Sequence, residues 1–288
     1  MENKINKNRF PLYGWIGLIL TVVFWILNWS LSGLRTDWGF FPMWLGYCLT
    51  TDAIVFKRKG TSLIKRNVKK YIALFLVSAP AWWLFELFNN VLQNWHYEGR
   101  QYFTNLQYII LASLSFSTVI PAVFETAELA GTFKRIKKIK SNNKIIITNS
   151  TAVKLFATGI IMLTVILFFP KYFYYLIWIS IYLIIEPINL LLKNRTLLEY
   201  IREGEWKLVI TLALGCLICG FFWEMWNFYS YPKWIYHLPF VNFLHVFEMP
   251  LLGYIGYIPF SFELFALFHL VTGIIFKERF NNYIQIVQ

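Results

Sequence analysis

The sequence contains few charged residues. Asp, Glu, Lys and Arg together make up 15% of its 288 residues, whereas 58% are hydrophobic and 20% are aromatic. A chain with so little charge has too few polar side chains to cover the surface of a water-soluble globule of this size. The composition therefore excludes an ordinary soluble enzyme and predicts a polytopic membrane protein.

Cysteine and histidine are also scarce, with three and four residues respectively. All three cysteines fall in apolar stretches, and a thiol inside a lipid-embedded helix is a poor nucleophile even where Cys216 and Cys219 have the spacing of a redox motif. The histidines lack the short spacing of a metal-binding helix. No metal site and no redox cofactor are expected.

Eight apolar segments are long enough to cross a bilayer as helices. They cover residues 11–33, 40–56, 71–93, 106–130, 152–169, 172–192, 208–229 and 250–276. The first is too long for a signal peptide and has no small-residue cleavage site, so it is expected to remain as a helix. The predicted fold class is all-α integral membrane, with eight transmembrane helices.

Basic residues are concentrated in the short loops between these segments. The loops 57–70 and 131–151 are rich in Lys and Arg, which is typical of cytoplasmic loops beside membrane spans. This pattern predicts a multi-pass protein of the cell membrane with both termini in the cytoplasm. The net charge of +12 then indicates membrane lipids as partners, not nucleic acid, and the oligomeric state stays open.

Polar landmarks recur along the chain at a nearly constant offset. Five pairs are separated by 138 residues: Glu86/Glu224, Asn89/Asn227, Ile120/Ile258, Pro121/Pro259 and Glu125/Glu263. Trp44/Trp178 and Asp52/Glu186 are separated by 134 residues, as expected if one loop is four residues longer. The pattern predicts two repeats, residues 1–140 and 141–288. Because each has four helices, the repeats are parallel, with a pseudo-symmetry axis along the membrane normal.

Seven acidic residues fall inside the predicted spans, where a charge is costly and usually marks function. They are Asp52, Glu86, Glu125, Glu128, Glu186, Glu224 and Glu263. Because few basic residues are nearby, most are expected to be neutral acids. For Asp52 and Glu128, ionisation in water near the cytoplasmic interface is an equal alternative. Asn89 and Asn227 follow Glu86 and Glu224 by three residues and are expected to hydrogen-bond them. The alternative is that these acids only join helices by hydrogen bonds.

Aromatic residues surround the two acids that are followed by asparagine. Trp83 and Phe85 precede Glu86, and Trp223 and Trp226 flank Glu224. Aromatic ring faces stabilise a transient cation, and a neutral acid can protonate an alkene in a site that excludes water. This combination meets the requirements for carbocation cyclisation of an isoprenoid, a reaction that needs no cofactor.

The order of these motifs resembles that of the membrane-integral lycopene cyclases of the heterodimeric or fused type. The similar strings are Trp223-Glu224, Trp234-Ile235-Tyr236 and Ile258-Pro259 with Glu263, and, in the first half, Phe85-Glu86, Trp95-His96-Tyr97 and Ile120-Pro121 with Glu125. The resemblance implies that Glu224 and Glu263 supply the acid and the base. The family has aspartate after the tryptophan and an adjacent glutamate pair, so the differences leave the substrate open among carotenoid-like and other polyprenyl lipids.

The sequence thus predicts a cofactor-independent cyclase or isomerase of an isoprenoid. The expected catalytic residues are Glu224, Glu263, Glu86 and Glu125, and the expected substrate contacts are Trp223, Trp226, Asn227, Asn89, Trp83, Phe85, Glu186 and Asp52. The main alternative is a proton-coupled transporter of a small molecule or lipid, because intramembrane acids in repeats also serve such carriers. A metal-dependent prenyl enzyme is less favoured because no Asp-x-x-x-Asp cluster is present, and a non-enzymatic lipid-binding role stays open.

Overall fold

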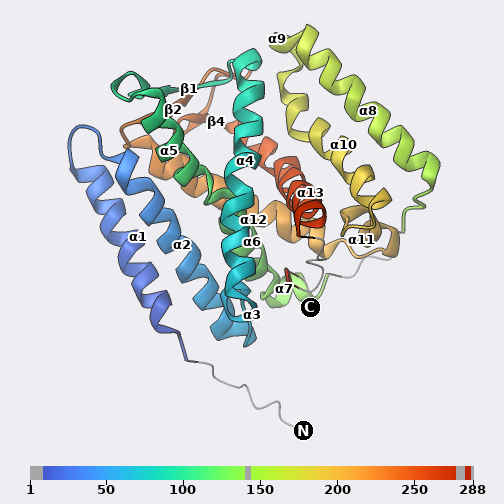
Figure 1. Cartoon of the computed structure of the whole chain (residues 1–288), viewed down its shortest axis with the longest axis horizontal. Coiled ribbons are helices and arrows are strands. Elements are labelled where there is room, and N and C mark those ends of the chain that lie inside the picture. Colours follow the sequence, from blue (N-terminus) through green and yellow to red (C-terminus); the bar gives the residue numbers. More distant parts are fainter. Residues whose placement is uncertain (1–8, 140–143, 277–282, 287–288) are drawn as a thin grey trace.

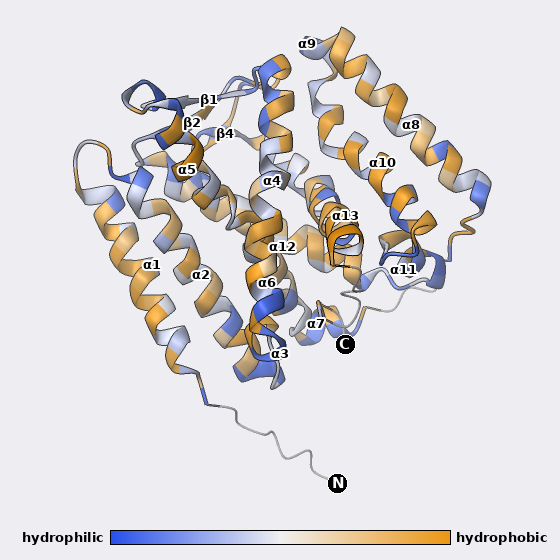
Figure 2. Cartoon of the chain, viewed as in Figure 1, coloured by the Kyte–Doolittle hydropathy of each residue, from blue (hydrophilic) through white to orange (hydrophobic). Residues whose placement is uncertain are grey.

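The computed structural model describes residues 9–139, 144–276 and 283–286. Seven helical stretches in these ranges are long and apolar enough to cross a membrane: Leu12–Ser30, Val68–Leu92, Asn105–Gly131, Asn149–Phe168, Pro170–Leu191, Lys207–Phe228 and Leu251–Ile275. Hydrophobic residues cover α1 and α8 in Figure 2, and many of them are exposed on the outside of the bundle. The fold is all-α and has the spans of a multi-pass membrane protein.

The elements follow one another as a chain of helices with two short strand pairs. The helices up to residue 139 are α1 (Leu12–Ser30), α2 (Thr36–Lys59), α3 (Leu63–Arg66), α4 (Val68–Leu92), η1 (Arg100–Tyr102), α5 (Asn105–Phe116), α6 (Val119–Gly131) and α7 (Lys134–Lys137). From residue 144 they are α8 (Asn149–Phe168), α9 (Pro170–Phe173), η2 (Tyr174–Leu176), α10 (Ile177–Leu191), α11 (Leu197–Glu203), α12 (Lys207–Phe228), η3 (Leu251–Gly256) and α13 (Tyr257–Ile275). The strands are β1 (Trp95–Glu98), β2 (Lys233–Tyr236), β3 (His245–Val246) and β4 (Met249–Pro250).

The predicted span 40–56 is the one that does not reappear among the seven stretches. It forms part of α2, which lies beside α1 (Figure 1) but begins with Thr and Asp and ends with three basic residues. This polar composition makes α2 less apolar than its neighbours. Membrane crossing by α2 stays a prediction.

A break in the helix precedes a proline in two of the predicted spans. The predicted span 106–130 is divided into α5 and α6, and Pro121 is the third residue of α6. Pro259 is likewise the third residue of α13, directly after η3. A proline fits in the first turn of a helix, where its missing N–H has no helical partner to lose. Ser78 joins the first break, because its hydroxyl donates to the carbonyl of Phe116 and accepts from the N–H of Ile120.

The short helices of the basic loops lie at one end of the bundle. Figure 1 places α3, α7 and α11 together at this end, called here the basic end. The strand pair of β1 and β2 lies at the opposite end with α9, and this is called the strand end. The helices α3 and α7, from the basic loops 57–70 and 131–151, therefore share one side of the bundle, as expected of loops on one side of a membrane.

Two membrane acids occupy corresponding places near the basic end. The Asp52 carboxyl accepts a hydrogen bond of 2.9 Å from the backbone N–H of Ile64, in α3. The Glu186 carboxyl accepts one of 2.9 Å from the backbone N–H of Leu198, in α11. Both pairs of residues differ by 134 positions, which is the offset found in the sequence. Each acid fixes a short helix to the span that precedes it.

The strand pair joins the two halves of the chain at the strand end. β1 and β2 are antiparallel, with Trp95 opposite Tyr236 and Tyr97 opposite Trp234. Because the sequence aligns Trp95 with Trp234 and Tyr97 with Tyr236, this pairing has local two-fold symmetry. The predicted repeat boundary at residues 140 and 141 lies outside the described residues, and the repeat stays a prediction.

Glycine allows α1 and α2 to pack with their backbones in contact. A Cβ atom on Gly46 would lie 2.6 Å from the carbonyl oxygen of Gly17 and 2.7 Å from the backbone nitrogen of Thr21. Gly17 is equally confined, since its Cβ would lie 2.7 Å from the carbonyl oxygen of Gly46. Such small-residue contacts let membrane helices approach closely.

Gly46→Ala is expected to separate α1 from α2 and to lower the free energy of unfolding by about 1–3 kcal/mol. The measurement is reversible unfolding of the purified protein in detergent. Gly39→Ala on the same helix is the control, because its Cβ would meet only Phe24, at 3.9 Å. Equal stability of the two variants would contradict the proposed backbone contact.

Candidate functional site

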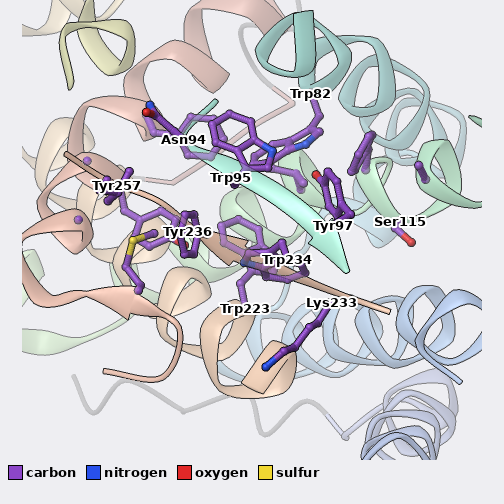
Figure 3. A pocket seen from close by; sticks show the side chains of 18 of the residues that line it. Trp82, Asn94, Trp95, Tyr97, Ser115, Trp223, Lys233, Trp234, Tyr236 and Tyr257 are labelled. Carbon is purple, nitrogen blue, oxygen red and sulfur yellow. The ribbon is translucent and has the colours of Figure 1, made fainter. Parts of the chain in front are cut away.

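A cavity of about 490 Å³ lies at the strand end, between elements of both halves (Figure 3). Its walls include residues of α2, α4, α5, α10, α12, α13, η2 and η3 and of the strands β1 and β2, and nearly half of the lining residues are aromatic. The aromatic lining includes Trp82, Trp95, Tyr97, Tyr108, Tyr174, Trp178, Trp223, Trp234, Tyr236, Tyr257 and Phe260. The charged residues at its edge are Asp37, Arg100 and Lys233.

Glu224 lies behind two tyrosines of this wall. Its carboxyl is fully buried on α12 and accepts hydrogen bonds of 2.8 Å from Tyr236 and 2.6 Å from Tyr257. Burial and the neighbouring Glu224 carboxylate raise the pKa of the Tyr236 hydroxyl well above its ordinary value. Tyr236 therefore stays protonated, and a chain of hydrogen bonds connects the buried carboxyl to the cavity surface.

Glu86 has a similar arrangement in the first half. Its Oε1 atom accepts hydrogen bonds from the indole of Trp82 at 2.9 Å, the indole of Trp95 at 3.0 Å and the hydroxyl of Tyr97 at 2.5 Å. All three donors line the cavity. Burial and the Glu86 carboxylate raise the pKa of Tyr97, so this hydroxyl also stays protonated.

Asn89 and Asn227 do not hydrogen-bond the neighbouring carboxyls, so this expectation was wrong. The Asn89 side chain donates to the carbonyl of Trp95 at 2.7 Å and accepts from the N–H of Asn94. Asn227 donates to the carbonyl of Trp234 at 2.7 Å and accepts from its N–H at 3.0 Å. Both asparagines lie one turn nearer the helix end, where the chain that leaves the helix offers free backbone groups. They position β1 and β2 instead.

Tyr257 was not predicted from the sequence, and it takes the place that Trp82 has in the first half. The position equivalent to Trp82 at the offset of 138 is Gly220. A Cβ atom on Gly220 would lie 2.5 Å from the ring of Tyr257, so the glycine leaves the space that the tyrosine fills. Glu224 consequently has two hydroxyl donors, whereas Glu86 has one hydroxyl and two indoles.

Glu125 and Glu263 are fully buried but do not line the cavity. Their carboxyl oxygens have no hydrogen-bond partner among the described residues. Glu125 instead experiences the charges of Asp52 and Glu128. The structure thus brings Glu224 and Glu86 to the cavity through tyrosines and does not bring the other two predicted catalytic acids there.

The remaining membrane acids hold loops at the basic end. Glu128 forms an ion pair with Arg66, lies 3.8 Å from Lys59 and accepts a hydrogen bond of 2.7 Å from the N–H of Gln285. The expectation of almost no basic counter-charge does not hold for Glu128, whose ionised state was left open, because residues of the basic loop fold back onto the helix end. Asp52 and Glu186, expected to contact substrate, are not among the cavity residues.

Of the four predicted aromatic contacts, one lines the cavity, two are buried beside it and one lines a second pocket. Trp223 lines the cavity, whereas Trp226 is buried against Trp44 with ring centroids 4.9 Å apart. Phe85 is buried and stacks on Trp178, which itself lines the cavity. Trp83 lines a second pocket beside Glu86. Trp178 was missed as a site residue, although the sequence pairs it with Trp44.

The comparison with family models gave no match, and the comparisons with curated proteins and with solved structures gave no significant match. The resemblance to membrane-integral lycopene cyclases therefore depends on the short motifs alone. Among the described residues, no three His, Cys, Asp or Glu side chains are grouped so that they could hold a metal ion.

Proposed function

We propose that this chain is a membrane enzyme that binds an isoprenoid in the aromatic cavity and cyclises or isomerises it by protonating an alkene. The observation that carries the proposal is the buried Glu224 carboxyl, hydrogen-bonded to two tyrosine hydroxyls that border an aromatic cavity. Glu86 with Tyr97 forms the counterpart in the first half.

The cavity suits an apolar substrate. Its volume of about 490 Å³ is within the range of small-molecule sites, and its lining is almost entirely hydrophobic. It accommodates one end of a polyprenyl chain, while the rest of a longer molecule extends into lipid. The indole faces of Trp82, Trp223 and Trp234 supply the electron density that stabilises a carbocation after water is excluded.

The reaction needs only proton transfers and a rearrangement of carbon bonds. A neutral Glu224 gives its proton to the hydroxyl of Tyr257 or Tyr236 while that hydroxyl protonates one carbon of a double bond. A new C–H bond forms, and the adjacent carbon becomes cationic. A second double bond attacks it to close the ring. The cation then loses a proton from a neighbouring carbon to the tyrosine hydroxyl, which passes its own proton to the Glu224 carboxylate. The product has the mass of the substrate.

The resemblance implies that Glu263 is the base, with Glu86 and Glu125 in the equivalent half. We assign both proton transfers to Glu224 instead, because the hydroxyls of Tyr236 and Tyr257 connect Glu224 to the cavity. Glu263 neither lines the cavity nor has a hydrogen-bond partner among the described residues. Glu263 and Glu125 then have a structural role in their helices and no catalytic role. Glu263→Gln distinguishes these assignments. It should abolish conversion if Glu263 is the base, and it should leave conversion intact if Glu224 makes both proton transfers.

The proposed architecture has eight membrane spans in two parallel four-helix repeats, with both termini in the cytoplasm. The matching contacts of Asp52 and Glu186 support the repeats, as does the two-fold pairing of β1 with β2. The location of the basic loops at one end supports the orientation.

Gly220→Ala is expected to reduce substrate conversion at least about tenfold, because the added Cβ displaces Tyr257 and breaks its hydrogen bond to Glu224. Conversion per amount of folded protein is the measurement. Tyr257→Phe should cause a similar loss, because it removes the same hydrogen bond without crowding. Gly39→Ala is the control for a harmless methyl group in a buried helix. A Gly220→Ala variant with normal conversion would contradict the role of Tyr257.

The function is tested by expressing the chain in bacteria that accumulate lycopene or another polyprenyl substrate. Extracted lipids should contain a product of unchanged mass with altered retention and absorbance. The alternative, a proton-coupled transporter, is tested with the purified protein in liposomes. Solute-dependent proton movement without any lipid product would replace the enzyme proposal by the transporter.

A further inference from the structure

Glu86 borders a second pocket that Glu224 lacks. This pocket of about 420 Å³ lies where the end of α4 meets β1 and α5 (Figure 1). It is lined by Trp83, Glu86, Leu87, Asn89, Asn90, Gln93, Tyr97 and Tyr108. Glu86 is half-buried, whereas Glu224 is fully buried and does not line this pocket. The two acids are therefore equivalent in sequence but differ in access.

Three aromatic rings from three different elements form the walls of this pocket. The ring centroids of Trp83 and Tyr108 are 6.2 Å apart with an interplanar angle of 82°. Those of Tyr97 and Tyr108 are 6.0 Å apart at 65°. Because the rings stand at steep angles to one another, they enclose the space from several sides instead of stacking.

Hydrogen bonds hold the rings of Trp83 and Tyr97, and a cation–π contact holds that of Tyr108. The Trp83 indole donates to the hydroxyl of Ser113 at 2.9 Å, and the Tyr97 hydroxyl donates to Glu86. The guanidinium of Arg100 lies 4.3 Å from the centroid of the Tyr108 ring. Arg100 lines the larger cavity and not this pocket, so its charge lies outside the three walls.

The Glu86 carboxyl has one oxygen available to a ligand. All three of its hydrogen bonds end on Oε1. In the part of the chain that the structure describes, the ion pairs do not include Glu86. A partly buried carboxylate with donors on one oxygen and no cationic neighbour offers its charge to a cation from outside.

We propose that this pocket binds a methylated ammonium group, such as a trimethylammonium cation. A quaternary ammonium donates no hydrogen bonds and is held by ring faces together with a nearby negative charge. The pocket provides three rings and one carboxylate, whereas a hard metal ion requires several oxygen ligands. The cation can belong to a small soluble molecule or to a phospholipid headgroup, and the strand end is accessible to both. Tyr97 and Tyr108 also line the larger cavity, but binding of the cation requires no reaction at Glu224.

The test is calorimetric titration of the purified full-length protein with tetramethylammonium chloride, in a detergent without an ammonium headgroup. Saturable binding is expected, and potassium chloride should not reproduce it. Glu86→Gln should weaken binding at least about tenfold, since it removes the charge that the cation faces. Glu224→Gln is the matched control, because it removes the equivalent acid without touching the pocket.

Two variants of one ring separate the aromatic cage from a general effect of charge. Tyr108→Phe keeps the ring and should bind normally, whereas Tyr108→Leu removes a wall and should lose most of the affinity. Because this pair leaves Glu86 unchanged, it also decides the question if Glu86→Gln fails to fold. Binding by Tyr108→Leu that equals binding by Tyr108→Phe would overturn the proposal.

The source of the cation is distinguished in nanodiscs. Phosphatidylcholine in place of phosphatidylglycerol should weaken tetramethylammonium binding if the lipid headgroup occupies the pocket. Unchanged affinity, with competition by free choline, would assign the pocket to a soluble ligand. No saturable binding to the unaltered protein in phosphatidylglycerol nanodiscs, or equal binding of potassium, would overturn the inference for both sources.

Discussion

Glu224→Gln is expected to lower isoprenoid conversion by about 100- to 10,000-fold, the range that a general acid contributes. Glutamine has nearly the same shape and can still accept hydrogen bonds from Tyr236 and Tyr257. It cannot deliver a proton. The measurement is product formed per amount of folded protein, determined by chromatography of extracted lipids.

The control for this variant is Glu203→Gln, which changes an exposed acid at the end of α11. It should convert substrate at the normal rate. If Glu224→Gln also converts substrate normally, Glu224 is not the proton source. If its loss of activity only follows a loss of folded protein, Glu224 is a structural hydrogen-bond acceptor and the catalytic role fails.

Glu128→Gln is expected to lower the free energy of unfolding by about 3–5 kcal/mol, because it leaves a buried cation without its partner. Glu128 is fully buried and pairs with Arg66, and it also accepts the N–H of Gln285. The substitution removes the negative charge that pairs with Arg66, and it weakens the attachment of residues 283–286. Unfolding in detergent gives the energy, and proteolysis reports release of the C-terminal segment.

Glu203→Gln again serves as the comparison, since an exposed acid contributes little to stability. Arg66→Met together with Glu128→Gln should recover part of the lost stability, because the cation that pairs most closely with Glu128 is then removed as well. A Glu128→Gln protein as stable as the unaltered chain would show that the ion pair does not hold the basic end together.

Much of the membrane architecture could be predicted from the sequence. Seven of the eight predicted segments correspond to stretches long and apolar enough to cross a membrane, because length and hydrophobicity are local properties. The offset of 138 residues also identified Glu86 and Glu224 as equivalent, and both are found beside a tyrosine of the central strands. α2, which contains the eighth predicted segment, is not one of these stretches, because its ends are polar.

The position of an acid relative to the cavity could not be predicted in this way. Glu263 lies six residues after Tyr257 on α13, which is about 9 Å along the helix axis. Sequence spacing shows on which face of a helix a residue lies, but it does not show how far the cavity extends along that helix. Tyr257 lines the cavity, and Glu263 does not. The same limit applies to Asn89, whose spacing indicated the correct face but the wrong partner.

Contacts between distant parts of the chain were also hidden from the sequence. The pairing of Trp95 with Tyr236 and the approach of Gln285 to Glu128 join segments separated by more than a hundred residues. Neither contact leaves a local pattern of hydrophobicity or spacing. Gly220 was a local indication that Tyr257 contacts this site. A glycine at the position equivalent to Trp82 indicates space for another side chain.

The most direct test of the central claim is conversion of the isoprenoid substrate by the purified protein in deuterated water. If the Glu224 and tyrosine chain protonates an alkene and exchanges its proton with solvent between turnovers, each ring closure adds one carbon-bound deuterium and the product mass rises by about one unit. Glu224→Gln should abolish this incorporation. A rearranged product without carbon-bound deuterium, or no product from any polyprenyl substrate, would contradict the account.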